Sequence, residues 1–184
     1  MNTIRYRLYT QTHNERNELV QIRDILNYEQ PTKYLVTNTD YSFNIESTPV
    51  LTANKAFILG YTDEDFGIYD KGENIIFDDF TMDMKFVDFP FKVKSSAIKI
   101  LTAKRNVDLK FMFEYLFFLD LSSNEHKRHY ISEIEPMKIS LPDFNQQKQI
   151  SIVLSSIDKK LKTESEIRML LIKQKQYLLA NLFI

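Results

Sequence analysis

The stretch LPDFNQQKQISIVLSSIDKKLKTESEIRMLLIKQKQYLLANLFI, residues 141–184, predicts one long C-terminal helix. Pro142 ends the preceding strand, Asp143 can act as the N-cap, and Gln146 stands three residues later at the capping-box position. No Pro or Gly follows Pro142 as far as residue 184. Apolar residues recur with helical spacing at Ile150, Leu154, Ile157, Leu161, Ile167, Leu171, Leu178 and Leu182.

A helix of about forty residues would be roughly 60 Å long, because each residue adds 1.5 Å. That length exceeds what a small globular domain can cover. The apolar stripe therefore predicts packing against a second long helix, and the rest of the chain contains no segment with such a pattern. The sequence indicates a helical partner from outside the chain.

Composition is ordinary for a soluble globular protein, with 43% hydrophobic and 27% charged residues among 184. The chain contains no Cys, which excludes disulfides and thiolate zinc sites and suits the reducing cytoplasm. The opening MNTIRYRLYT is too polar for a signal peptide. The longest apolar run, residues 111–119, is short and interrupted by Glu114, so no membrane span is expected.

Charge is unevenly distributed along the chain. Residues 146–184 hold seven Lys or Arg against three acids, whereas residues 1–145 hold 17 against 22, a net charge of −5. A globular part with this balance is not an obvious nucleic-acid binder, so any such function must depend on local basic patches.

Three segments are predicted: a polar lead-in (1–17) without assigned structure, an α+β domain (18–142) and the long helix (143–184). The domain is rich in short strands, expected near residues 49–52, 56–61, 74–77, 85–89 and 96–101. Asp108 to Leu119 has the pattern of a capped, mostly buried helix. Two further extended pieces are expected around Tyr130–Ile134 and Met137–Ser140.

Several stretches together resemble the specificity subunit of Type I restriction–modification systems. The stretches, in order along the chain, are Gln30-Pro-Thr-Lys-Tyr, Thr48-Pro-Val-Leu-Thr-Ala, Phe57-Ile-Leu-Gly-Tyr, Ile76-Phe-Asp-Asp-Phe-Thr, Phe91-Lys-Val-Lys-Ser-Ser-Ala-Ile-Lys-Ile-Leu, His126-Lys-Arg-His-Tyr-Ile-Ser and the junction Leu141-Pro with Gln147, Ile150, Leu154 and Ile157-Asp158.

In that family one chain normally carries two target recognition domains and two spacer helices, which pack antiparallel. The subunit lends sequence specificity to separate methyltransferase and restriction subunits and is not itself catalytic. This chain departs from the pattern, because it holds one domain and one helix and so looks like a half-size form. The resemblance implies a homodimer whose helices form an antiparallel coiled coil and whose two identical domains read an interrupted palindrome in double-stranded DNA.

The basic run from Lys92 to Lys110 is the first candidate DNA contact. It holds six basic residues against one acid, and alternation over Phe91-Lys-Val-Lys would place both lysines on one strand face. Such residues can neutralise phosphates, although a solvated strand face explains the charge equally well. The resemblance favours DNA contact by Lys92, Lys94, Lys104 and Arg105.

A second basic cluster, His126, Lys127 and Arg128, precedes His129. Arg128 can bind a guanine edge or a phosphate, and an exposed basic turn is the alternative. The two His residues lack a third ligand nearby in sequence, so no metal site is predicted.

Residues 61–90 are acidic, and Asp83-Met-Lys85 formally matches part of a nuclease metal motif. Such short matches are common by chance, and the resemblance assigns cleavage to another subunit. Asp78 and Asp79 are expected to fix a loop by accepting backbone hydrogen bonds, or alternatively to accept from a cytosine amino group. No nucleotide-binding or hydrolase motif is present, so no cofactor and no catalysis are expected.

Two functions from different classes follow from these patterns. The first is a non-catalytic DNA-recognition subunit. The second is a degenerate specificity fragment that dimerises or binds modification subunits without reading DNA. The basic strand and loop distinguish the two, because a pure interaction module would not need them.

Overall fold

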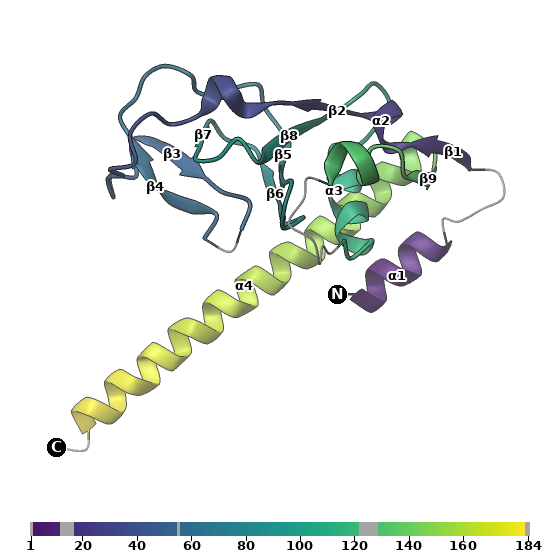
Figure 1. Ribbon diagram of the computed structural model, residues 1–184. Coiled ribbons are helices and arrows are strands. Elements are labelled where there is room, and N and C mark those ends of the chain that lie inside the picture. The colour runs from purple at the N-terminus through teal and green to yellow at the C-terminus, as the bar shows by residue number, and fades with distance from the viewer. Residues whose placement is uncertain (1, 12–16, 55, 122–128, 183–184) are drawn as a thin grey trace.

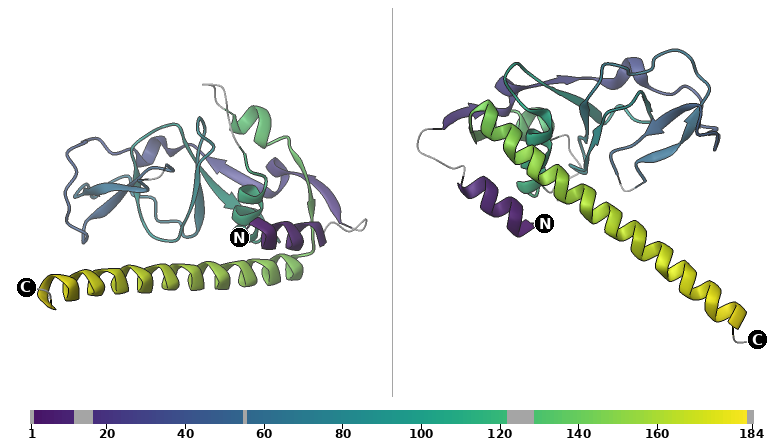
Figure 2. Two further views of the ribbon diagram at one scale, coloured as in Figure 1. Left: turned by 90° about the horizontal axis from the view of Figure 1, so that it is seen from below. Right: turned by 180° about the vertical axis from the view of Figure 1, so that it is seen from behind.

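The computed structural model describes residues 2–11, 17–54, 56–121 and 129–182 of the chain. A globular α+β part is followed by one long helix, α4 (Phe144–Leu182), which projects well beyond it (Figure 1). The views in Figure 2 show the far half of α4 running past the globular part as an arm. The predicted fold class, short strands and helices followed by a long C-terminal helix, is confirmed.

Three small sheets form the globular part. A two-stranded antiparallel sheet pairs the segments at either end of the domain, β1 (Glu18–Gln21) and β9 (Lys138–Leu141). The largest sheet is antiparallel throughout, in the order β2 (Leu26–Glu29), β8 (Ile98–Ala103), β5 (Asn74–Asp78) and β6 (Met84–Val87). The third has the order β4 (Ile58–Thr62), β3 (Thr48–Leu51) and β7 (Lys92–Val93), with β3 parallel to β7.

The four-stranded sheet is buried on both faces. Along β5, Ile75 and Phe77 belong to one core and Ile76 to the other, as the alternation of a strand requires. The first core is covered by α3 (Leu109–Phe118). Asp108 is the N-cap of this helix, and its carboxylate accepts a 2.7 Å hydrogen bond from the N–H of Phe111. The second core lies between the two larger sheets.

Four shorter elements complete the globular part: α1 (Asn2–Gln11), α2 (Ile22–Ile25), a 3₁₀ turn (Pro31–Tyr34) and a π-helical turn (Tyr130–Ile134). Two predictions were wrong here. The lead-in is not without structure, because α1 packs against α3 through buried Arg5 and Tyr9. Tyr130–Ile134 is helical rather than extended, because burying both of its end residues overrides their strand propensity.

The start of α4 follows the predicted chemistry. Asp143 accepts bonds from the N–H groups of Asn145 and Gln146 at 2.9 and 3.0 Å. The first turns then pack on the globular part, and Leu154 is fully buried. From Lys159 to Leu182 every residue is exposed.

The apolar stripe of α4 is therefore divided, and its first part was wrongly assigned to an intermolecular seam. Ile150 and Leu154 belong to the core beneath α3, where they are withdrawn from any partner helix. Ile157 is half-buried at the point where the helix leaves the domain. The members of the predicted stripe that remain exposed are Leu161, Ile167, Leu171, Leu178 and Leu182. No helix in the described part of the chain is long and apolar enough to cross a membrane.

Candidate DNA interface

Lys92 does not lie on the surface. Its side chain is fully buried, and its Nζ lies 2.6 Å from Glu64 Oε2 and donates to the carbonyl of Phe66 at 2.7 Å. The alternation that predicted an exposed lysine face fails because Phe91, Lys92 and Val93 are all enclosed. Lys92 is thus unavailable to a phosphate, and its assignment as a DNA contact was wrong.

The Lys92–Glu64 pair instead ties two loops to β7. The other oxygen of Glu64, Oε1, accepts bonds from the hydroxyl and N–H of Thr37 and from the N–H of Asn38. Burial alone would raise the pKa of Glu64, but these bonds and the one from Lys92 outweigh burial and lower the pKa to about 2. Glu64 therefore stays ionised and fixes the chain near residues 37–38.

Two further cations of the basic run are also paired with acids of the protein. Lys99 is buried with its Nζ 3.4 Å from Asp79 Oδ2 and over the ring of Tyr28. Lys110 lies 3.6 Å from Glu114 Oε1. Because these pairs neutralise the lysines locally, the run contributes much less surface charge than its sequence indicates.

Lys94, Lys104 and Arg105 differ from the buried lysines in their access to solvent. Lys94, directly after β7, is exposed. Lys104 is half-buried and its Nζ donates to the carbonyl of Arg23 at 2.6 Å, whereas Arg105 is exposed. Lys94 and Arg105 are thus the members of the predicted patch that can reach a phosphate without breaking a bond the structure shows.

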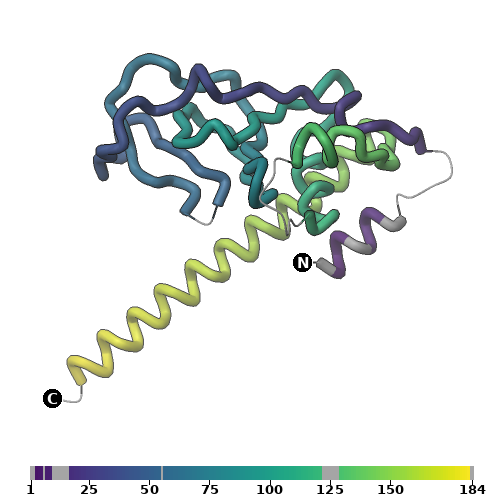
Figure 3. The backbone as a smooth tube through the Cα atoms, in the orientation of Figure 1, coloured from purple at the N-terminus to yellow at the C-terminus, as the bar shows by residue number. Residues whose placement is uncertain are grey.

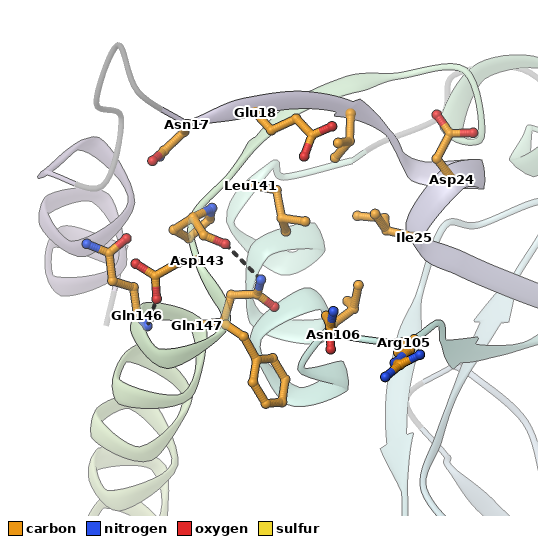
Figure 4. A pocket seen from close by; sticks show the side chains of 14 residues that line it. Asn17, Glu18, Asp24, Ile25, Arg105, Asn106, Leu141, Asp143, Gln146 and Gln147 are labelled. Carbon is orange, nitrogen blue, oxygen red and sulfur yellow. Dashed lines mark hydrogen bonds between the residues drawn. The ribbon is translucent and has the colours of Figure 1, made fainter.

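Arg105 stands at the edge of a cleft of about 750 Å³ between the turn after β8, strands β1 and β9, and the first turn of α4 (Figure 4). The cleft is also lined by the carboxylates of Glu18, Asp24 and Asp143. Asp143 is already committed to capping α4. The carboxylates would repel a phosphate from the interior of this cleft. Arg105 is therefore a candidate phosphate contact only on the side that faces solvent, outside the cleft.

The second basic cluster, His126, Lys127 and Arg128, lies outside the described residues. The chain that follows it is firmly anchored, because the N–H groups of His129 and Tyr130 donate to Asp79 Oδ1 at 3.1 and 2.8 Å. His129 is buried with Nδ1 3.0 Å from Glu133 Oε2.

The expectation that Asp78 and Asp79 fix loop geometry is confirmed. Asp78 Oδ1 accepts from the N–H groups of Phe80 and Thr81 at 2.9 and 3.0 Å. Asp79 is buried and holds the chain after residue 128, so the alternative of cytosine contact does not apply to it. Within the described ranges no group of three or more His, Asp or Glu side chains could hold a metal ion.

The three buried ion pairs, Lys92–Glu64, Lys99–Asp79 and Arg5–Glu114, were not expected from the sequence. Their members come from different elements, and nothing local distinguishes a lysine that will be enclosed from one that stays in water. The only signal in the sequence is that Lys92 and Lys99 fall in strands expected to be buried. A buried strand can enclose a lysine only together with a partner of opposite charge.

The comparisons with known proteins agree with this architecture. Residues 14–171 match the model of the Type I restriction modification DNA specificity domain. The chain belongs to this family. The match includes the globular domain and α4 as far as Leu171, so the first half of the arm lies within the family unit.

The Type I restriction enzyme EcoR124I/EcoR124II specificity subunit of Escherichia coli is 45% identical over 142 residues, which cover 73% of this chain and 35% of the relative. The S subunit of the Type I restriction-modification system of M. genitalium has a TM-score of 0.71 at 11% identity, covering 96% of this chain and 51% of that one. The HsdS subunit of Thermoanaerobacter tengcongensis has a TM-score of 0.55 at 12% identity, with coverages of 88% and 45%.

A third chain, from a structure of complex assembly and conformational transition of the Type I R-M system, has a TM-score of 0.58 at 14% identity and coverages of 91% and 51%. At these identities the solved structures show a shared fold. This chain spans about a third of the Escherichia coli relative and about half of each solved chain. It thus contains a single domain-and-helix unit.

Proposed function

We propose that this chain is the DNA-recognition subunit of a Type I restriction–modification system, with one recognition domain and one spacer helix. The observation that supports this best is the family match over residues 14–171, which includes the domain together with α4 as far as Leu171. In this proposal the chain selects the DNA sequence, while methyltransferase and restriction subunits in the same cytoplasmic complex carry out the chemistry. The chain itself uses no cofactor or metal.

A second copy of the chain is the proposed partner of the arm. The exposed stripe Leu161, Ile167, Leu171, Leu178 and Leu182 has between 44% and 69% of each side chain accessible, which is a large apolar area for a helix without a partner. The relatives are about twice as long as this chain. A two-fold dimer restores two domains from identical halves.

An antiparallel dimer defines the separation of the recognition domains. If residues 161–182 pair with themselves, the dyad falls between Leu171 and Ile172. The arms leave their domains at Asp158, so the two exit points lie roughly 40 Å apart at 1.5 Å per residue. That distance is close to one turn of B-DNA, about 34–36 Å, so both domains can face the same side of a duplex. The target is then an interrupted palindrome.

Phosphate contacts are assigned to Lys94 and Arg105, with Lys104 joining if it exchanges its carbonyl partner for a phosphate. Each such contact releases counterions, so the contacts raise affinity without selecting sequence. His126, Lys127 and Arg128 are proposed to supply the second contact region. Arg128 is the candidate for reading a guanine edge.

The deciding experiment begins by mapping methylated adenines in host DNA with and without the gene, which identifies the target. Binding of the chain with its methyltransferase is then measured on target and scrambled duplexes over a salt series. The proposal predicts a clear preference for the target and a steep fall of affinity with salt. Binding to the methyltransferase without preference for any DNA would refute DNA reading and leave the interaction module.

A further inference from the structure

Four charged side chains from three helices converge where α4 leaves the globular part. Arg5 of α1 donates from Nε to Glu114 Oε2 of α3 at 2.9 Å, and its Nη2 lies 2.8 Å from the same oxygen. The same Nη2 lies 4.0 Å from Asp158 Oδ1 of α4. Lys110 lies 3.6 Å from Glu114 Oε1. Neither the DNA contacts nor the dimer stripe uses this cluster.

Burial shows that Arg5 is held firmly. The side chain of Glu114 is fully enclosed and that of Arg5 is 9% exposed, so each requires the other to offset its loss of water. The guanidinium also lies 4.8 Å from the centre of the Phe117 ring. Helix α1 itself is fixed by Tyr9, whose ring packs against the aromatic rings of α3.

The position of Asp158 along α4 gives the cluster its significance. The start of α4 is fixed by Gln147, which donates to the carbonyl of Pro142 and accepts from the N–H of Asp108. Asp158 lies about 16 Å further along the helix, and beyond it every described residue of α4 is exposed. Between these two points Leu154 is fully buried in the core, and the contact of Arg5 with Asp158 is the outermost restraint on the direction of the helix before the arm begins. Figure 2 and Figure 3 show α1 lying near the part of α4 that is next to the globular part.

The arm beyond Asp158 acts as a lever. Its 24 residues to Leu182 extend about 36 Å, so a rotation of about 10° at the exit point moves the tip by about 6 Å. In a dimer this movement changes the separation of the two domains by more than the rise of one base pair, about 3.4 Å. A small loss of restraint at Asp158 is therefore large at the DNA.

We propose that Arg5 is a positioning residue, which bridges Glu114 and Asp158 and thereby fixes the direction of the arm relative to the recognition domain. In the dimer this restraint sets the gap between the two half-sites. The inference about the gap rests on the proposed DNA-reading function, whereas the inference about the direction of the arm does not.

The direction of the arm is measured directly by double electron–electron resonance. Because the chain contains no Cys, the pair Asn27→Cys and Lys173→Cys accepts two spin labels at unique exposed positions, one in β2 and one on the arm. Lys173 is about 200° around the helix from Leu171, so its label avoids the proposed seam. Mixing with excess unlabelled chain leaves one labelled protomer per dimer.

The parent is expected to give one narrow distance distribution. Asp158→Asn removes only the charge that α4 contributes to the cluster, and it should broaden the distance distribution. Arg5→Met should broaden the distribution further. If the arm can rotate by about 10° at residue 158, the added width is about 4 Å. Glu164→Gln, an exposed carboxylate further along the arm, is the matched control and should change nothing. If Asp158→Asn and Arg5→Met both keep the parental width, the proposal is overturned.

The consequence for DNA is tested on duplexes in which the gap is lengthened or shortened by one or two base pairs. The parent should prefer one gap, and Arg5→Met should lower that preference severalfold while keeping the half-site sequence. An unchanged gap preference in Arg5→Met would contradict the assigned role. If the parent itself binds no DNA specifically, the proposed function fails, and the spin-label distances still decide the role of Arg5.

Discussion

Replacing Leu154 with Ala tests whether the first part of the α4 stripe belongs to the core of the chain. Leu154 is fully buried beside α3, so the change removes apolar contacts and leaves a cavity. Comparable substitutions cost about 2–5 kcal/mol, a large share of the roughly 5–15 kcal/mol that stabilises a typical domain. With an m-value near 2 kcal/mol per M, the urea midpoint should fall by roughly 1–2.5 M.

The assay is urea unfolding followed by circular dichroism in a background carrying Leu171→Glu, so that dimerisation does not contribute. Leu178→Ala in the same background is the matched control, because Leu178 is exposed in a monomer and Ala favours the helix. Its midpoint should hardly move. Equal effects of Leu154→Ala and Leu178→Ala would refute the division of the stripe into a core part and a free part.

Other consequences can be measured separately. Leu171→Glu should bury an unpaired charge in the dimer and give monomers in light scattering at micromolar concentration, with the globular fold intact. Lys94→Ala removes one phosphate contact from each protomer, so in the proposed dimer it should lower the slope of log affinity against log salt by roughly two and weaken binding to all sequences equally. Lys92→Met should instead destabilise the domain, because it leaves Glu64 without its cation. The lowered pKa of Glu64 contributes stability that is fully present above its ordinary pKa of 4.5 and is lost as pH falls towards 2. Glu64→Gln should therefore unfold more easily at pH 7 and show a flatter dependence between pH 4.5 and 3 by urea unfolding.

The helices show how far local sequence chemistry specifies structure. Asp143 and Asp108 cap the helices that follow them, as predicted, because an N-cap needs only a side-chain oxygen and the next few N–H groups. The length of α4 was also predicted correctly, because no Pro or Gly follows Pro142. The sequence could not show where the domain stops covering α4, since Leu154 and Leu161 lie on one continuous stripe and differ only in tertiary contacts.

Helix α1 was missed for the opposite reason. It has few apolar residues, and its docking depends on Tyr9 among the α3 rings and on Arg5 reaching Glu114, more than a hundred positions away. No local pattern predicts a contact of this kind. The π-helical turn at Tyr130–Ile134 likewise depends on distant partners, because Asp79 accepts the N–H of Tyr130 at its start.

The candidate interface was predicted only in part because alternation says which residues share a face and not what covers it. Lys92 and Lys94 share a face of the predicted strand, yet Lys92 is enclosed beside Glu64 and Phe66 while Lys94 is exposed. Burying Lys92 requires an acid, and the acid comes from a loop after β4. Sequence composition overestimates a basic patch wherever lysines serve internal ion pairs.

The pairing of these lysines with internal acids limits how strongly the proposed recognition domain can bind DNA. Residues 1–145 carry a net charge of −5, and Lys92, Lys99 and Lys110 are neutralised by partners inside the protein. The arm (residues 159–182), in contrast, carries six basic residues against two acids. Because non-specific affinity depends on the number of phosphates neutralised, one isolated domain should bind DNA weakly. In the proposed dimer, pairing two arms would bring both sets of basic residues beside the gap between the half-sites, where they could neutralise phosphates. Dimerisation would then supply the electrostatic affinity that each domain lacks, and a monomeric Leu171→Glu variant should lose much more than half of the dimer's salt-dependent binding.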